Sequence, residues 1–163
     1  MAVTQQLACL SEADLIKCLH NQSSLESLLN FTLLSGYQYL DLNWEITYLK
    51  ALIREYHYGS LISYSEAVDG IHNLPDSLGE QDVEEQPAYN RFNDVEKIIS
   101  GLNEIDIDNL LSKLPPSLDQ INKLLGSHYD DLPYKHLSDT FRQLTGFYRT
   151  AEKKKYCVVC WWD

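Results

Sequence analysis

Two sets of residues have types and spacings that could support chemistry, and the first is a pair of cysteines. Cys157 and Cys160 have the Cys-x-x-Cys spacing that occurs in redox sites and in zinc sites. On a strand, however, residues three apart point to opposite faces, and no second cysteine pair offers the remaining zinc ligands. We therefore expect these two residues, with Cys9 and Cys18, to be free and mostly buried thiols.

The second set lies just before the last long helix that the sequence predicts. His128, Asp130 and His136 could be arranged around a divalent metal with open coordination positions. An aspartate at this point can instead cap the following helix and complement its dipole. A metal-dependent hydrolase that uses these residues, or carboxylates of the acidic segment described below, is kept as the alternative function.

The common catalytic motifs are missing from this sequence. It contains no Gly-x-Ser-x-Gly elbow, no glycine-rich phosphate loop and no His-Glu-x-x-His zinc helix. Its five histidines are scattered without a shared spacing. The lack of a motif does not exclude an enzyme, but it favours a protein that binds rather than catalyses, with no cofactor.

Negative charge is concentrated in one segment of the chain. The formal net charge is −11 at pH 7, which argues against nucleic acid as a direct partner. Residues 55–90 hold eight acidic and no basic side chains, whereas residues 1–54 and 91–163 have net charges of only −2 and −1. Such a block is either a hydrated loop or a surface that steers and docks a basic protein.

We predict that this surface binds a basic protein partner. The candidate contact residues are Tyr64, Glu66, Asp69, Asp76, Glu80, Asp82, Glu84 and Glu85. Their carboxylates would stand in for phosphates, while a few aromatic anchors would supply most of the binding energy. One version of this function is an immunity protein that covers the basic active site of a bacterial toxin.

Tyrosines are the other surplus, and several of them bracket one predicted helix. Tyrosine is favoured at interfaces, but it also fills the half-buried edge of many cores. The sequence leaves both roles open for Tyr37, Tyr39, Tyr56, Tyr58 and Tyr64.

Hydrophobic periodicity predicts that residues 1–163 form a single α+β domain, in which N- and C-terminal strands join a small mixed or antiparallel sheet packed against several helices. Residues 3–10 form the first predicted strand, and the apolar residues 156–162 form a strand in the middle of the sheet. A short strand is expected at 88–92, and the segment at about 59–87 is expected to be irregular and acidic, with at most one short helix. Helices are expected at about 11–19, 22–36, 41–57, 93–102, 106–114, 117–126 and 133–155.

The sequence also bears on location. Its first residues show neither a basic opening nor a long apolar core, so we expect no secretory signal. Its apolar runs are much shorter than the roughly 20 residues that a membrane span needs. We therefore expect a cytoplasmic protein that makes no contact with a membrane.

The order of these features resembles the YfbM-like bacterial family, a domain of unknown function. The similar segments cover nearly the whole chain apart from residues 60–86, and they are the opening strand with residues 11–15, then 40–49, 92–98 leading to 105–106, 137–141 through 147–153, and the closing strand to 161–163. The resemblance implies an α+β fold. It implies no reaction, because the family has no assigned catalytic residues.

Overall fold

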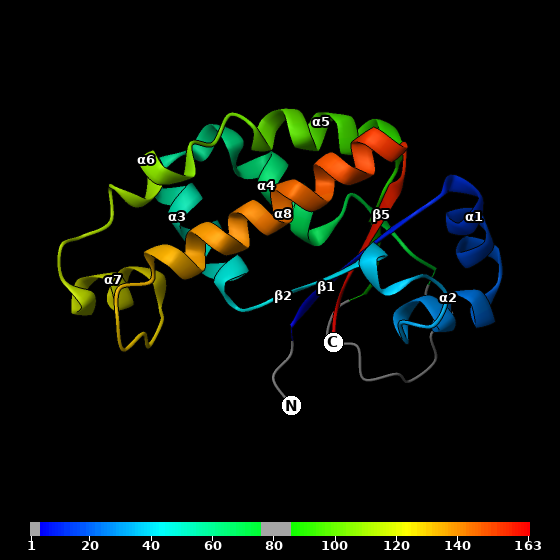
Figure 1. Ribbon diagram of the computed structural model, residues 1–163, viewed down its shortest axis with the longest axis horizontal. Helices are drawn as coiled ribbons and strands as arrows, with labels where there is room; N and C mark the ends of the chain where they lie inside the picture. Colours follow the sequence, from blue (N-terminus) through cyan, green and yellow to red (C-terminus); the bar gives the residue numbers. More distant parts are fainter. Residues whose placement is uncertain (1–3, 76–85) are drawn as a thin grey trace.

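The computed structural model describes residues 4–75 and 86–163 (Figure 1). Within these residues, the strands form one antiparallel sheet in the order β2-β1-β5-β4-β3. The predicted α+β fold, with the N- and C-terminal strands in the sheet, is confirmed. The strands are β1 (Gln5–Leu10), β2 (Tyr39–Leu42), β3 (His72–Asn73), β4 (Ala88–Asn90) and β5 (Cys157–Trp162).

Helices pack on both faces of this sheet (Figure 1). One face is covered by α1 (Glu12–His20) and α2 (Gln22–Leu29), drawn in blue in Figure 1. The helices of the larger core, on the other face, are α3 (Glu45–Tyr56), α4 (Leu61–Asp69), α5 (Phe92–Leu102), α6 (Ile107–Leu111), α7 (Leu118–Leu125) and α8 (Tyr134–Lys154). None of the helices in the described ranges is long and apolar enough to cross a membrane.

Strand β5 lies in the middle of the sheet, as its apolar sequence predicts. It pairs with β1 on one side and with β4 on the other. Val158 and Cys160 enter the larger core, whereas Cys157, Val159 and Trp161 enter the smaller one. A strand buried on both faces must be apolar at every position, which explains why polar and apolar residues do not alternate in this segment.

Several helix boundaries follow from caps that are visible in the sequence. The Ser11 hydroxyl accepts a hydrogen bond from the Asp14 N–H, and Asp106 and Ser117 cap α6 and α7 in the same way. Helix α7 ends at Gly126, which adopts the left-handed conformation with φ of 68°. These four boundaries agree with the sequence predictions.

Among the boundaries that differ from the predictions, three have a visible cause. The second helix ends at Leu29 rather than near residue 36, because Phe31 adopts a left-handed φ of 59° that stops the helix. The third helix begins at Glu45 rather than at residue 41, because residues 39–42 pair with β1 as strand β2. The cap of α5 is not Asn93: the helix already begins at Phe92, and the Asp94 carboxylate accepts the Arg91 N–H at 2.9 Å.

A buried polar network holds α4, β4 and α8 together. The Tyr148 hydroxyl donates to the Ala67 carbonyl at 2.7 Å and accepts from the Asn90 side-chain amide at 3.0 Å. The same amide donates to the Glu66 carbonyl, and the Asn90 side-chain oxygen accepts from the Ile71 N–H. Asn90 and Tyr148 are both fully buried, so these bonds replace the water that each group loses.

Candidate functional site

The described part of the acidic segment is centred on α4. Ile62, Glu66 and Asp69 are spaced by four and three residues, which places them along one face of this helix. The opposite face, with Tyr64, Ala67 and Val68, is buried in the larger core. Just before α4, Tyr58 is 73% exposed, and Ile62 itself is 70% exposed. The outward face of α4 therefore combines apolar and acidic side chains.

The prediction that Tyr64 contacts a partner was wrong. This side chain is completely buried, and its hydroxyl donates to the Ile46 carbonyl at 2.8 Å. Burial raises the pKa of Tyr64 well above its usual value. Acidic residues close in sequence suggested a surface position, but helical periodicity turns Tyr64 away from them and into the core.

The predicted acidic contact residues fall into two groups. Glu66 and Asp69 lie together on the outward face of α4, where the Asp69 carboxylate pairs with the Lys50 ammonium at 2.5 Å. The Glu66 carboxylate has no hydrogen-bond or ion-pair partner in the described part of the chain. The remaining five, Asp76, Glu80, Asp82, Glu84 and Glu85, lie outside the described residues.

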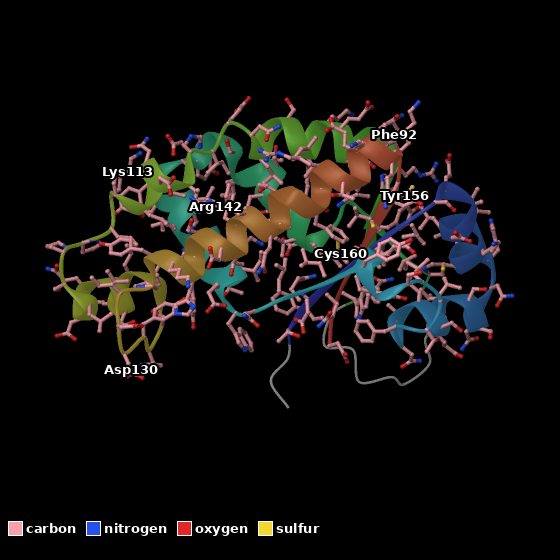
Figure 2. All side chains as sticks on the ribbon, in the orientation of Figure 1. Phe92, Lys113, Asp130, Arg142, Tyr156 and Cys160 are labelled. Atoms are coloured by element: carbon pink, nitrogen blue, oxygen red, sulfur yellow. The ribbon has the colours of Figure 1, made fainter. Side chains whose placement is uncertain are left out.

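The histidines and aspartate proposed as metal ligands do not form a metal site. Across residues 4–75 and 86–163, no three His, Cys, Asp or Glu side chains come together as a group that could hold a metal ion. His128, Asp130 and His136 are all exposed, and Figure 2 shows Asp130 at the outer tip of the loop that joins α7 to α8. Asp130 is not the cap of α8 either, because that helix begins after Pro133.

The four cysteines are free and buried, as the sequence predicts. Burial raises the pKa of every one of these thiols, to about 11 for Cys18 and to about 12 for Cys160. Figure 2 shows Cys160 within the sheet. Because the thiolate is the reactive form, buried thiols with raised pKa values contribute packing rather than nucleophilic or redox chemistry.

A surface hollow lies where β1, β2 and β5 extend beyond α2. Its volume is about 630 Å³, and we call it the sheet hollow. It is lined by Thr4, Gln6, Phe31, Gly36, Tyr39, Asp41 and Asp163. Gln6 pairs with Asp41 on β2 and with Trp161 on β5, so these three side chains point to the same face of the sheet. This is the face that α1 and α2 cover further along the strands.

Sequence reasoning missed the sheet hollow. One signal was available: two glutamines, Gln5 and Gln6, occupy a strand that is otherwise apolar, although both are buried. The aromatic side of the hollow could not be foreseen, because it depends on strand β2 and on the early end of α2. Residues 30–36 and 41–42 were expected to be helical, whereas residues 37–40 were assigned to no element.

The chain matches no protein-family model and no curated protein. Among solved structures, it matches the protein of unknown function YfbM from Escherichia coli with a TM-score of 0.65. The alignment covers 98% of this chain and 99% of that chain. This chain has the YfbM fold. The resemblance to YfbM-like proteins, predicted from the order of elements, is thereby confirmed for the structure.

The two sequences are only 15% identical, so the likeness to YfbM shows the fold alone. YfbM is itself described as a protein of unknown function, and no activity, partner or binding residue comes from it. Any function therefore has to be argued from the residues of this chain.

Proposed function

We propose that this chain is a non-enzymatic binding protein whose acidic segment docks on a basic protein. The observation that carries the proposal is the charge distribution: residues 55–90 hold eight acidic and no basic side chains. A field of one sign speeds the association of an oppositely charged partner and disfavours acidic competitors. The rest of the chain is nearly balanced in charge, so the partner would approach this segment.

The outward face of α4 supports the same proposal. Tyr58 and Ile62 are large apolar side chains that remain mostly exposed, beside the carboxylates of Glu66 and Asp69. Protein interfaces commonly have a few apolar or aromatic anchors surrounded by a polar rim. In such an arrangement, the anchors contribute most of the affinity, and the carboxylates contribute speed and specificity.

The proposed partner class is a protein with a basic binding site, and one version is a toxin that acts on nucleic acid or nucleotides. The active site of such a toxin must attract phosphates, so it carries lysine and arginine side chains. Carboxylates that occupy the phosphate positions would block it. In this version the chain acts as an immunity protein.

The charge of the segment can be tested by neutralising the five acids that lie between β3 and β4. Asp76→Asn, Glu80→Gln, Asp82→Asn, Glu84→Gln and Glu85→Gln are combined in one variant. The protein captured from the source cell by the unmodified chain is first identified and purified. Its association rate with the variant should fall at low salt by at least about tenfold, because electrostatic steering contributes factors of about 10 to 10³.

The matched control neutralises five acids that are exposed in the described part of the chain: Glu96, Glu104, Asp119, Asp130 and Asp131. The control changes the net charge by the same amount. If the position of the charges matters, the association rate of the control should stay much closer to that of the unmodified chain. Undiminished and salt-insensitive capture by the first variant would contradict the proposal. For the toxin version, the captured protein should arrest growth when expressed alone and not when expressed together with this chain; a captured protein without toxicity would exclude that version.

A further inference from the structure

A second hollow lies between α6 and the N-terminal half of α8, which pack against each other (Figure 1). Its volume is about 450 Å³, a size typical of small-molecule sites, and we call it the α6–α8 hollow. Helix α6 contributes Asp108 and Leu111 to its lining, and α8 contributes Lys135, Ser138, Asp139 and Arg142. The charged side chains that line it are two acids and two bases, so the hollow has no net charge.

The residues from α8 share one face of that helix. Lys135, Ser138 and Arg142 are spaced by three and four residues, and Asp139 lies one turn after Lys135. Arg142, labelled on α8 in Figure 2, donates from Nη2 to both carboxylate oxygens of Asp108, at 3.1 and 3.3 Å. These two charges therefore satisfy each other at one end of the hollow.

Ser138 carries a polar group without a partner in the wall of the α6–α8 hollow. The residue is only 7% exposed, and within residues 4–75 and 86–163 its buried hydroxyl has no hydrogen-bond partner. A serine or threonine inside a helix commonly donates to the carbonyl four residues earlier. On the same helix, Thr145 donates in this way to Phe141 at 3.0 Å, and Thr150 donates to Gly146 at 2.9 Å.

A buried hydroxyl without a partner costs stability, so the Ser138 hydroxyl is an independent indication that the hollow receives a polar ligand. The other two charges of the hollow point the same way. Lys135 and Asp139 have the spacing at which opposite charges on a helix often pair, yet neither forms an ion pair in the described part of the chain. One free cation and one free anion, a turn apart, match a ligand that carries both charges.

We propose that the α6–α8 hollow binds a free α-amino acid with an apolar side chain. The ligand carboxylate pairs with Lys135 and accepts the Ser138 hydroxyl, while its ammonium group pairs with Asp139. Leu111 and the ring of Tyr134, which also lines the hollow, provide apolar contacts for the ligand side chain. A phosphate fits less well, because Asp139 would repel it and nothing in it would pair with that carboxylate.

The first test is isothermal titration calorimetry of the whole chain with leucine, valine, methionine and phenylalanine as probes. At least one of them should bind saturably, with a Kd of the order of 0.1–1 mM for so small a ligand. Two analogues of the best probe separate the charges: the N-acetyl derivative lacks the ammonium group, and the amide lacks the carboxylate. Each should bind at least about fivefold more weakly, because it loses one charge-assisted hydrogen bond.

The second test changes the charges of the hollow. The double variant Lys135→Gln, Asp139→Asn should weaken binding of the amino acid by at least about tenfold, because both charge-assisted contacts are lost. The matched control is Asp119→Asn with Lys123→Gln on α7. This pair is also exposed and one turn apart, but it lies outside the α6–α8 hollow, so the control should bind as the unmodified chain does.

The third test is Ser138→Ala. It should weaken binding about three- to tenfold, because the ligand carboxylate loses a donor. It should not lower the urea midpoint of the ligand-free protein, because no hydrogen bond is lost and alanine favours the helix. A lower midpoint would show that the hydroxyl already has a structural partner, and it would overturn the inference.

Other outcomes would also overturn it: no saturable binding of any of the four amino acids, equal binding of the blocked analogues, or full binding by either variant of the hollow. The inference is independent of the proposed function, because no residue of the acidic segment at 55–90 lines the hollow. Capture of a basic protein therefore tests the proposed function alone, and amino-acid binding tests the hollow alone.

Discussion

At the scale of single residues, the buried tyrosines show how this fold uses polar groups in its core. Tyr148 is completely buried and connects α8 to the Ala67 carbonyl and to the Asn90 side chain. Tyr64 reaches the Ile46 carbonyl in the same manner. Tyrosine in this protein is thus partly a structural residue: its ring fills the core, and its hydroxyl, which burial removes from water, donates to a backbone carbonyl.

The substitution Tyr148→Phe tests this role. It should lower the free energy of unfolding by about 1–3 kcal/mol, because the buried Ala67 carbonyl keeps only the weak Cys160 thiol as a donor and the buried Asn90 amide loses an acceptor. Urea denaturation measures the change, with an unaltered dependence on denaturant concentration. Tyr37→Phe is the control, since Tyr37 is 74% exposed and should shift the midpoint little. Equal effects of the two substitutions would show that the buried network contributes nothing measurable.

At the scale of elements, the close contact of α4 with α5 depends on one glycine. A Cβ placed on Gly101 of α5 would lie only 2.5 Å from the Cβ of Ser63 on α4. Ser63 cannot avoid this contact by rotating its hydroxyl, because its Cβ is fixed to the backbone. Gly101 therefore sets how closely α4 and α5, and with α4 the Glu66 side chain one turn after Ser63, approach each other.

The prediction for this contact compares two helical glycines. Gly101→Ala should destabilise the protein by about 1–3 kcal/mol, because overpacking forces α4 and α5 apart. Gly146→Ala on α8 should stabilise it by about 0.5–1 kcal/mol, because no atom outside its own helix backbone lies near the added Cβ and alanine favours the helix. Thermal or urea unfolding of both variants measures whether each substitution lowers or raises the stability. Stabilisation by Gly101→Ala would mean that the helices adjust freely.

The elements differ in how far they could be predicted from the sequence. Boundaries with a local chemical cause, such as the Ser117 cap and Gly126, were predicted correctly because the capping side chain lies beside the helix that it ends. Strand β2 was missed, because residues 39–42 become a strand only through pairing with β1, some thirty residues earlier in the chain.

The candidate sites follow the same division. The acidic segment is visible as composition, whereas the sheet hollow combines Gln6, Phe31, Asp41 and Asp163 from separate parts of the chain. Tyr64 was misplaced because charged neighbours in sequence say nothing about the face on which a helical residue lies. A single sequence does not reveal which residues from distant parts of the chain come together in the fold.

At the scale of the whole molecule, the sheet separates two cores that both contain cysteine. Cys9 and Cys160 lie in the larger core, and Cys18 and Cys157 lie in the smaller one. Burial raises the pKa of each thiol, so the folded state keeps protons that the unfolded chain releases at alkaline pH. The stability of both cores is therefore coupled to pH in the same direction.

This coupling predicts alkaline destabilisation. Between about pH 9 and pH 12, the unfolded state loses the Cys160 proton while the folded state retains it, so the free energy of unfolding falls by about 1.4 kcal/mol per pH unit for this thiol. Urea denaturation between pH 7 and pH 10.5 should show the decline. Cys160→Ala should be less stable at pH 7, because it leaves a cavity, but its decline should be shallower. An identical slope in the variant would contradict the prediction.

The pairing of β1 with β5 has a consequence for the order of folding. The Gln5 side chain donates to the Trp161 carbonyl across 156 residues of sequence, and the ladder between these strands lies beside it. During synthesis, β1 therefore leaves the ribosome long before its main partner exists, and until then only β2 can pair with it. Both cores contain side chains of β5, so neither core can be completed before this strand is in place. We expect slow and cooperative folding that begins once the last strand is available.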